Sequence, residues 1–333
     1  MANLYLIEQG AVLRKTGDRL IVEKDAKELL EVECFKIDTV FLFGNVHVTT
    51  PALTELLEHG IELAFLTMGG RLKGQLTPPK AKNILLRMAQ YQKGQDSIWR
   101  RDLARTVVDG KIRNGLALLH RQQRNYPDRG FSPYRDELQG LRDKVQAVET
   151  LESLRGLEGA AARSYFAAFA LACRTELQFE GRRRRPPTDP INALLSFGYT
   201  LVTAELTSLL DAMGYDPYLG VYHQLDYGRP SLALDLLEEF RVPAVDRLVL
   251  NLTNLRTLQA SDFVTDSESG GLRLDRKALG KFFRAYEDHL NKEFTDKSNG
   301  TTTTLRKIFR RQAERLAAAL TKEQPYTAFL AEW

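Results

Sequence analysis

The residues of this chain best suited to chemistry lie between His223 and Arg241. The segment begins with an imidazole, passes through a Gly-Arg-Pro turn and continues as a helix expected to begin at about Ser231. Asp235 and Glu238 are three positions apart, so a helix places both carboxylates on one face. A histidine delivered from a loop beside helical carboxylates predicts half of a divalent-metal site.

A third anionic ligand has to come from elsewhere in the chain, and Glu158 is the candidate. It stands between Gly156 and Gly159, whose lack of a side chain allows a ligand or another backbone to approach closely. The alternative interpretation is that Glu158, at the head of an apolar helix expected over Leu157–Leu177, only stabilises the helix N-terminus.

The carboxylates of the His223 segment also allow an ordinary interpretation, because acids on an amphipathic helix usually form a solvated face. Asp235 and Glu238 compete for one ligand position, and Glu239 is expected to point away, solvated or paired with Arg241 or Arg247. The remaining histidines lie in strand or helix contexts without a constellation of carboxylates, and they are interpreted as structural or surface groups: His47, His59, His120 and His289.

One imidazole and two carboxylates form a mixed nitrogen and oxygen ligand set. Such a set suits Mg²⁺ or Mn²⁺ better than a structural zinc site, which favours thiolates. An ion held in this way keeps positions for water and phosphate oxygens, and it can promote in-line displacement at phosphorus. The predicted chemistry is phosphodiester hydrolysis or transesterification by a DNA 3′-hydroxyl.

Basic side chains occur in groups that would suit a phosphate-bearing substrate. The first group is the run Arg182, Arg183, Arg184 and Arg185, which could equally be a solvated linker. The second, beside Trp99, comprises Arg100, Arg101, Arg105, Lys111 and Arg113. The third comprises Arg306, Lys307, Arg310 and Arg311. Guanidinium groups of this kind contact the nucleic-acid backbone rather than its bases.

The overall composition is that of a soluble globular protein large enough for two domains. The chain has 333 residues, a hydrophobic fraction of 43%, a charged fraction of 27% and a net charge of only +4. Its two cysteines, Cys34 and Cys173, lack metal-type spacing and are expected to be buried thiols in a reducing compartment. We find neither an apolar run long enough to span a bilayer nor a signal peptide, so the expected location is cytoplasmic, without membrane partners.

The order of predicted elements indicates an α+β protein, with a small β-sandwich-like domain over 1–78 and a larger all-α domain over 79–333. Short alternating runs and turn signals fill the first part, with one helix capped near Thr50, and the prolines at 78 and 79 mark a linker. Hydrophobic periodicity predicts the helices Ala81–Tyr91, Ile98–His120, Tyr134–Arg155, Leu157–Leu177, Pro190–Met213, Pro243–Leu258, Arg276–Lys292 and Leu305–Leu320. A small two-stranded excursion is expected over 262–275, and a mobile loop over Thr301–Thr304.

Three separated stretches, in this order, resemble successive motifs of the CRISPR-associated protein one family. They are LRGLEGAAARSYF at Leu154–Phe166, RPPTDPINALLSFGY at Arg185–Tyr199, and HQLDYGRPSLALDLLEEFR at His223–Arg241. The resemblance runs through nearly the whole chain, including its β-first, helix-second order. It implies a divalent-metal-dependent DNA endonuclease and integrase of CRISPR spacer acquisition, which inserts short duplex fragments into the CRISPR array.

Transferred to this sequence, the family's metal ligands fall on Glu158, His223 and Glu238, with Asp235 as a neighbour or substitute. Asn192 and Arg185 match the middle motif, where we expect support of the site or contact with DNA. DNA contacts are expected from Arg163, Arg182, Arg183, Arg184, Arg185, Asn192 and Arg229.

The resemblance also implies a homodimer formed through the β domains, with two dimers bridged by a dimer of a small second CRISPR adaptation protein. Its DNA partners would be a spacer precursor duplex and the CRISPR repeat, and an end-trimming nuclease is a further candidate partner. The alternatives from the residues themselves are a non-catalytic DNA-binding scaffold and a metal-dependent hydrolase of RNA or nucleotides.

Overall fold

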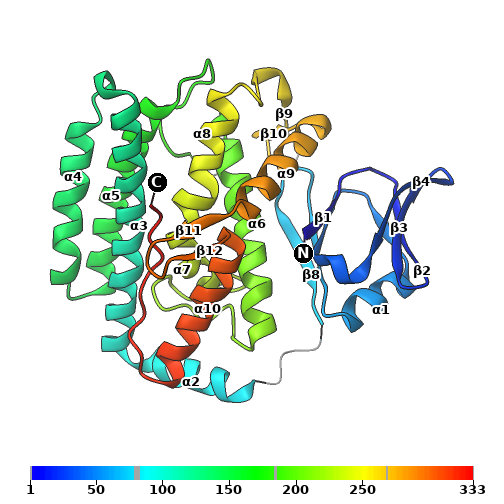
Figure 1. The fold of residues 1–333 in the computed structure, drawn as a ribbon, viewed down its shortest axis with the longest axis horizontal. Helices are drawn as coiled ribbons and strands as arrows, with labels where there is room; N and C mark the ends of the chain where they lie inside the picture. Colours follow the sequence, from blue (N-terminus) through cyan, green and yellow to red (C-terminus); the bar gives the residue numbers. More distant parts are fainter. Residues whose placement is uncertain (1, 79–82, 184–185, 268, 333) are drawn as a thin grey trace.

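The computed structural model describes residues 2–78, 83–183, 186–267 and 269–332. A β-rich N-terminal part lies beside a larger helical part, as Figure 1 shows. This arrangement confirms the predicted α+β fold class, a small β-sandwich-like region followed by a helical one. The expected domain boundary at 78 and 79 adjoins residues 79–82, which lie outside the described residues.

The N-terminal part contains two four-stranded sheets and one helix. The first sheet has the order β1 (Ala2–Leu6), β5 (Ile37–Phe43), β7 (Glu62–Leu66) and β8 (Leu72–Leu76), with β8 antiparallel to β7 and the other pairs parallel. The second has the order β4 (Lys27–Glu33), β3 (Arg19–Lys24), β2 (Val12–Thr16) and β6 (His47–Val48). Helix α1 (Thr50–Glu58) begins with Thr49 as its N-cap, one residue before the predicted cap, and it carries proline in its first turn.

The first sheet is also the side on which the two parts meet, because β1 contacts helix α9 (Arg276–Asn291). The ring of Tyr5 on β1 stacks on Phe283 of α9 at 4.1 Å between centroids, and its hydroxyl donates to Glu287 at 2.6 Å. Phe41 and Phe43 of β5 belong to the same hydrophobic core as the helices. One face of the first sheet therefore joins the core of the helical part, whereas the β-rich part also has a separate core that includes Leu13, Leu20 and Leu56.

The helical part is built from the remaining helices, and most of them match the predicted periodic segments. They are α2 (Ile84–Gln95), α3 (Ser97–Asn125), α4 (Ser132–Lys144), α5 (Leu151–Ala172), α6 (Pro190–Met213), α7 (Ser231–Phe240), α8 (Arg247–Asn254), α9 and α10 (Leu305–Thr321). A π-helical segment, Arg241–Asp246, joins α7 to α8. In the described part of the chain, α3 packs against α4, α5 and α7, so it forms the centre of the bundle (Figure 1).

Several predicted helices have different bounds, including Pro243–Leu258, and the differences in two of them matter for the site. The segment predicted as Tyr134–Arg155 is broken, because a short turn follows α4 and Thr150 accepts a hydrogen bond from the Ser153 amide as the N-cap of α5. Helix α5 therefore begins at Leu151 rather than Leu157.

The helical part also contains two short hairpins. One pairs β9 (Phe263–Thr265) with β10 (Leu272–Leu274), which confirms the two strands predicted over 262–275. The other pairs β11 (Phe294–Asp296) with β12 (Thr301–Thr303), so the prediction of a mobile loop at Thr301–Thr304 was wrong. That prediction considered only the local polar run, whereas the partner strand supplies backbone hydrogen bonds.

Helix α6 is long and apolar enough to cross a membrane by length and composition, contrary to the expectation from the sequence. However, 67% of its most apolar window is buried inside the protein. Its composition therefore reflects a position in the core, as in soluble helical proteins.

Candidate active site

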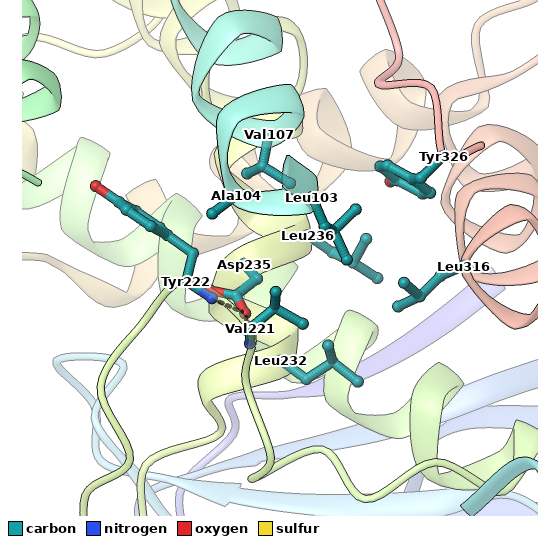
Figure 2. Close-up of a pocket in the computed structure, with 10 residues that line it drawn as sticks. All are labelled: Leu103, Ala104, Val107, Val221, Tyr222, Leu232, Asp235, Leu236, Leu316 and Tyr326. Atoms are coloured by element: carbon teal, nitrogen blue, oxygen red, sulfur yellow. Dashed lines mark hydrogen bonds between the residues drawn. The ribbon is translucent and has the colours of Figure 1, made fainter. Parts of the chain in front are cut away.

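Helix α7 positions the loop that carries His223. The Asp235 carboxylate, 3% exposed, accepts hydrogen bonds from the backbone amides of Val221, Tyr222 and His223 at 2.5, 3.1 and 2.8 Å. Figure 2 shows Asp235 directed toward the first two of these amides, with apolar side chains of α3 and α7 nearby. One helical carboxylate therefore fixes the backbone of a loop that has no regular structure of its own.

The same carboxylate orients the imidazole. Nδ1 of His223 lies 2.7 Å from Oδ1 of Asp235, so Nδ1–H donates to Asp235 and Nε2 lies on the other side of the ring. Nε2 faces Glu238, with 3.6 Å between Nε2 and Oε1. A ring nitrogen held in this tautomer beside a carboxylate has the form of a metal-binding histidine with a supporting acid.

Glu238 is 3% exposed and is held by two cations. Nη2 of Arg241 lies 3.0 Å from Oε1, and Nζ of Lys111 lies 2.5 Å from Oε2. Burial raises the pKa of the Glu238 carboxyl, but Arg241 and Lys111 outweigh burial and hold that pKa well below its usual range. Glu238 is therefore an ionised carboxylate inside the protein.

Glu158 joins the cluster through Lys111, because Oε1 of Glu158 contacts the same Nζ atom. Three helices thus bring together side chains distant in sequence: Glu158 from α5, Lys111 from α3 and Glu238 from α7. Glu158 is not at the head of its helix, because α5 begins at Leu151. This overturns the alternative in which Glu158 only interacts with a helix N-terminus, since that effect fades beyond the first turn.

The donor atoms of this cluster fit a divalent ion that prefers oxygen and nitrogen ligands. Oε2 of Glu238 is buried and has no hydrogen-bond partner within the described part of the chain, although it contacts the Lys111 ammonium. Among the described residues, no three side chains of His, Cys, Asp or Glu are close enough together to hold a metal ion in this conformation. The positive charge beside the Glu158 and Glu238 carboxylates comes from Lys111, and Arg241 adds a second cation at Glu238.

Glu239 differs from its prediction. It is fully buried rather than solvated, and it accepts hydrogen bonds from the Tyr326 hydroxyl, the Phe329 amide at 2.7 Å and Gln312 at 2.8 Å. Burial raises its pKa to about 7, although these donors act in the opposite direction. Glu239 therefore attaches the C-terminal segment, residues 322–332, to the helix that carries Glu238.

Neither Lys111 nor Arg241 was predicted from the sequence as a member of the cluster. Arg241 could have been found, because it lies three positions after Glu238 and a helical turn places the two together. Lys111 was assigned to a basic surface, and nothing local in the sequence indicates its two acidic partners.

The middle motif has mainly internal contacts. Asn192 is fully buried and uses its amide to accept from Arg182 at 2.8 Å and the Arg183 amide at 2.9 Å, and to donate to Gly181 and Asp189 at 2.8 and 2.6 Å. Its buried side chain therefore anchors the segment before α6, whereas the predicted DNA contact of Asn192 stays a prediction.

The predicted DNA-binding arginines differ in their exposure. Arg182 also donates to Ser196 at 3.0 Å and lies over the Tyr199 ring, whereas Arg183 is exposed. Arg163 is exposed and Arg229 is half-buried. Arg184 and Arg185 lie outside the described residues.

The third basic group is also partly engaged inside the fold. Arg306 pairs with Glu205 at 3.1 Å and with Glu287, close to the contact between β1 and α9, and Arg311 pairs with Asp296. These ion pairs make Arg306 and Arg311 structural residues rather than free phosphate ligands.

Comparison with known proteins identifies the family. The sequence model of the family described as CRISPR associated protein Cas1 matches residues 4–288. The chain belongs to the Cas1 family. A relative from Thermus thermophilus, named CRISPR-associated endonuclease Cas1 3, is 38% identical over 324 residues, which cover 97% of this chain and 95% of the relative.

Two further Cas1 relatives are informative. A protein of Geobacter sulfurreducens named CRISPR-associated exonuclease Cas4/endonuclease Cas1 fusion is 36% identical over 331 residues, covering 97% of this chain and 59% of that protein. A solved structure titled Cas6-RT-Cas1–Cas2 complex aligns with a TM-score of 0.85 and 28% identity, covering 98% of this chain and 36% of that chain. Membership of the Cas1 family confirms the prediction of a CRISPR-associated endonuclease and integrase.

Proposed function

We propose that this chain joins the 3′-hydroxyl ends of short duplex DNA to the repeat of a CRISPR array, in a divalent-metal-dependent transesterification at Glu158, His223 and Glu238. The observation that supports the proposal is that Nζ of Lys111 contacts both Glu158 and Glu238, while Nε2 of His223 lies 3.6 Å from Oε1 of Glu238. Membership of the Cas1 family, in which named relatives are endonucleases, supports a catalytic role for this cluster.

The site residues have separate roles in metal binding. Glu158 and Glu238 supply carboxylate oxygens and His223 supplies Nε2, while Asp235 keeps Nδ1 protonated and the loop in place. Arg241 holds Glu238 in its ionised form. When bound, Mg²⁺ or Mn²⁺ would supply Lewis-acid stabilisation of the phosphate charge and activation of the attacking hydroxyl.

Asp235 has a supporting role in this proposal. Its oxygens already accept four hydrogen bonds, three from backbone amides and one from the imidazole. A carboxylate with its lone pairs used in this way is a weaker candidate ligand than Glu238, whose Oε2 contacts only the Lys111 ammonium among the described residues. Glu238 is therefore the ligand and Asp235 the orienting residue.

The partners follow from the relatives. The solved structure titled Cas6-RT-Cas1–Cas2 complex supports assembly with the small second adaptation protein, Cas2. We infer that a spacer precursor duplex lies across this assembly. The Cas4 and Cas1 fusion supports an end-trimming nuclease as a further partner. We further assign the β-rich part to homodimerisation and the cytoplasm as the site of action.

The test is strand joining of a labelled duplex to a repeat-containing target with Mg²⁺, Mn²⁺ or EDTA. Glu158→Ala, His223→Ala and Glu238→Ala are each expected to abolish joining, whereas Glu152→Ala, an exposed acid on the same helix as Glu158, retains it. Circular dichroism establishes that each variant is folded. Full joining by His223→Ala would contradict the assignment, and DNA binding with no metal-dependent reaction would identify a scaffold.

A further inference from the structure

Lys111 contacts both acidic members of the candidate site. Its side chain, 16% exposed, reaches from the middle of α3, and Nζ contacts Oε1 of Glu158 while lying 2.5 Å from Oε2 of Glu238. An ammonium group is a compact donor of three hydrogen bonds with no acceptor. It therefore forms contacts with oxygen ligands that a metal ion would also form.

The two carboxylates need a cation between them. Glu238 is buried in a low-dielectric interior and Glu158 is only 18% exposed, so without positive charge they would repel each other strongly. Arg241 satisfies Oε1 of Glu238 and leaves Oε2 to Lys111. Lys111 is thus the cation shared by the two helices, α5 and α7, that carry the acids.

We propose that Lys111 is an internal counter-cation of the metal-free protein, and that a divalent ion binds by displacing its ammonium from Glu158 and Glu238. The inference rests on the proposed metal site. It agrees with the finding that no three potential ligands among the described residues are spaced for an ion. The carboxylates are arranged around the ammonium, and they complete the ligand set when the ammonium leaves.

This exchange has a consequence for affinity. Metal binding has to break two charged contacts of Lys111, so the apparent affinity for the ion is lower than the same donor atoms would give without the lysine. In return, the acids remain neutralised and the three helices remain packed when no ion is bound. Removing Lys111 should therefore change metal affinity and metal-free stability in opposite directions.

The experiment measures Mn²⁺ binding by isothermal titration calorimetry and thermal unfolding in EDTA and in Mn²⁺, using the full chain. Lys111→Met is expected to bind Mn²⁺ about tenfold more tightly than the wild type, since one competing cation is gone. In EDTA its Tm should fall by about 5 °C, because two acids lose their counter-charge. Addition of Mn²⁺ should raise the Tm of this variant more than that of the wild type.

Three further variants separate this effect from general damage. Lys111→Gln, which keeps a donor but no charge, should also bind Mn²⁺ more tightly, whereas Lys111→Arg, which keeps the charge, should not. Lys15→Met provides the matched control, because Lys15 also pairs with a buried acid, Glu55, but in the β-rich part. It should lose stability without a change in Mn²⁺ affinity.

Unchanged or weaker Mn²⁺ binding by both Lys111→Met and Lys111→Gln, with normal binding by the wild type, would overturn the inference and leave the proposed metal site intact. Absence of Mn²⁺ binding by the wild type and by both of these variants would overturn both proposals.

Discussion

The imidazole of His223 and the carboxylate of Asp235 are joined by a 2.7 Å contact between Nδ1 and Oδ1, and the same carboxylate also accepts the His223 backbone amide at 2.8 Å. One buried acid thus determines the position of the loop and the tautomer of the ring. The first prediction tests this relationship.

Asp235→Asn should weaken Mn²⁺ binding by about 10- to 100-fold, the usual cost of losing a supporting acid behind a metal-binding histidine. The asparagine amide group would present N–H donors to a position where four donors already converge. Calorimetry measures the affinity, and NMR of the imidazole nitrogens reports the tautomer. Asp226→Asn, in the exposed part of the same loop, is the control, and equal affinities for the two variants would contradict the orienting role.

The neighbouring arginines Arg182 and Arg183 should respond differently to substitution. Arg183 is exposed, so Arg183→Ala should reduce the slope of log K for DNA against log salt by about one, as expected for one lost phosphate contact. Arg182 is engaged with Asn192 and Ser196, so Arg182→Ala should lower the free energy of unfolding and leave the slope unchanged. Fluorescence anisotropy over a salt series and urea denaturation measure the two quantities. A slope change for Arg182→Ala alone would reverse the assignment.

The attachment of the C-terminal segment to α7 should depend on the Tyr326 hydroxyl. Tyr326→Phe removes one of the donors to the buried Glu239 and should lower the free energy of unfolding by about 1–3 kcal/mol. Urea denaturation at neutral pH measures the change. Tyr218→Phe, at a half-exposed tyrosine, should have little effect, and equal stability of the two variants would mean that the segment is not held by this contact.

The pH dependence of stability should include a contribution from His289. Burial lowers the pKa of this imidazole from 6.5 to about 4, and its Nε2–H donates to the Pro243 carbonyl at 2.7 Å. Between these pH values the unfolded chain binds the proton more readily, so the contribution is present above pH 6.5 and is lost as pH falls through 4.

His289→Gln retains a donor to Pro243 but does not titrate. Its free energy of unfolding, relative to the wild type, should therefore increase by about 3 kcal/mol between pH 7 and pH 4. Urea denaturation at several pH values measures this difference. A difference that stays constant over the range would show that the pKa of His289 is the same in the folded and unfolded protein.

The sequence by itself determined the broad architecture and the chemistry of the candidate ligands. The division into a β-rich and a helical part, and the bounds of α6 at Pro190–Met213, follow from local periodicity, prolines and caps, all of which act within a few residues. The choice of Glu158, His223 and Glu238 as candidate ligands followed from a family motif and from residue type. These signals come from local sequence patterns or from a family motif, so they do not depend on which helices pack together.

The tertiary structure decided which charged side chains lie in contact with one another. Whether Asp235 or Glu238 faces the histidine's outer nitrogen depends on how the loop folds back on α7, and the burial of Glu239 depends on a C-terminal segment far along the chain. Lys111 was predicted on a basic surface because its neighbours on α3 include several arginines, whereas packing of α3 against α5 and α7 places its ammonium between two acids. Electrostatic partners of this kind are set by distances between helices, and no pattern along a single helix contains that information.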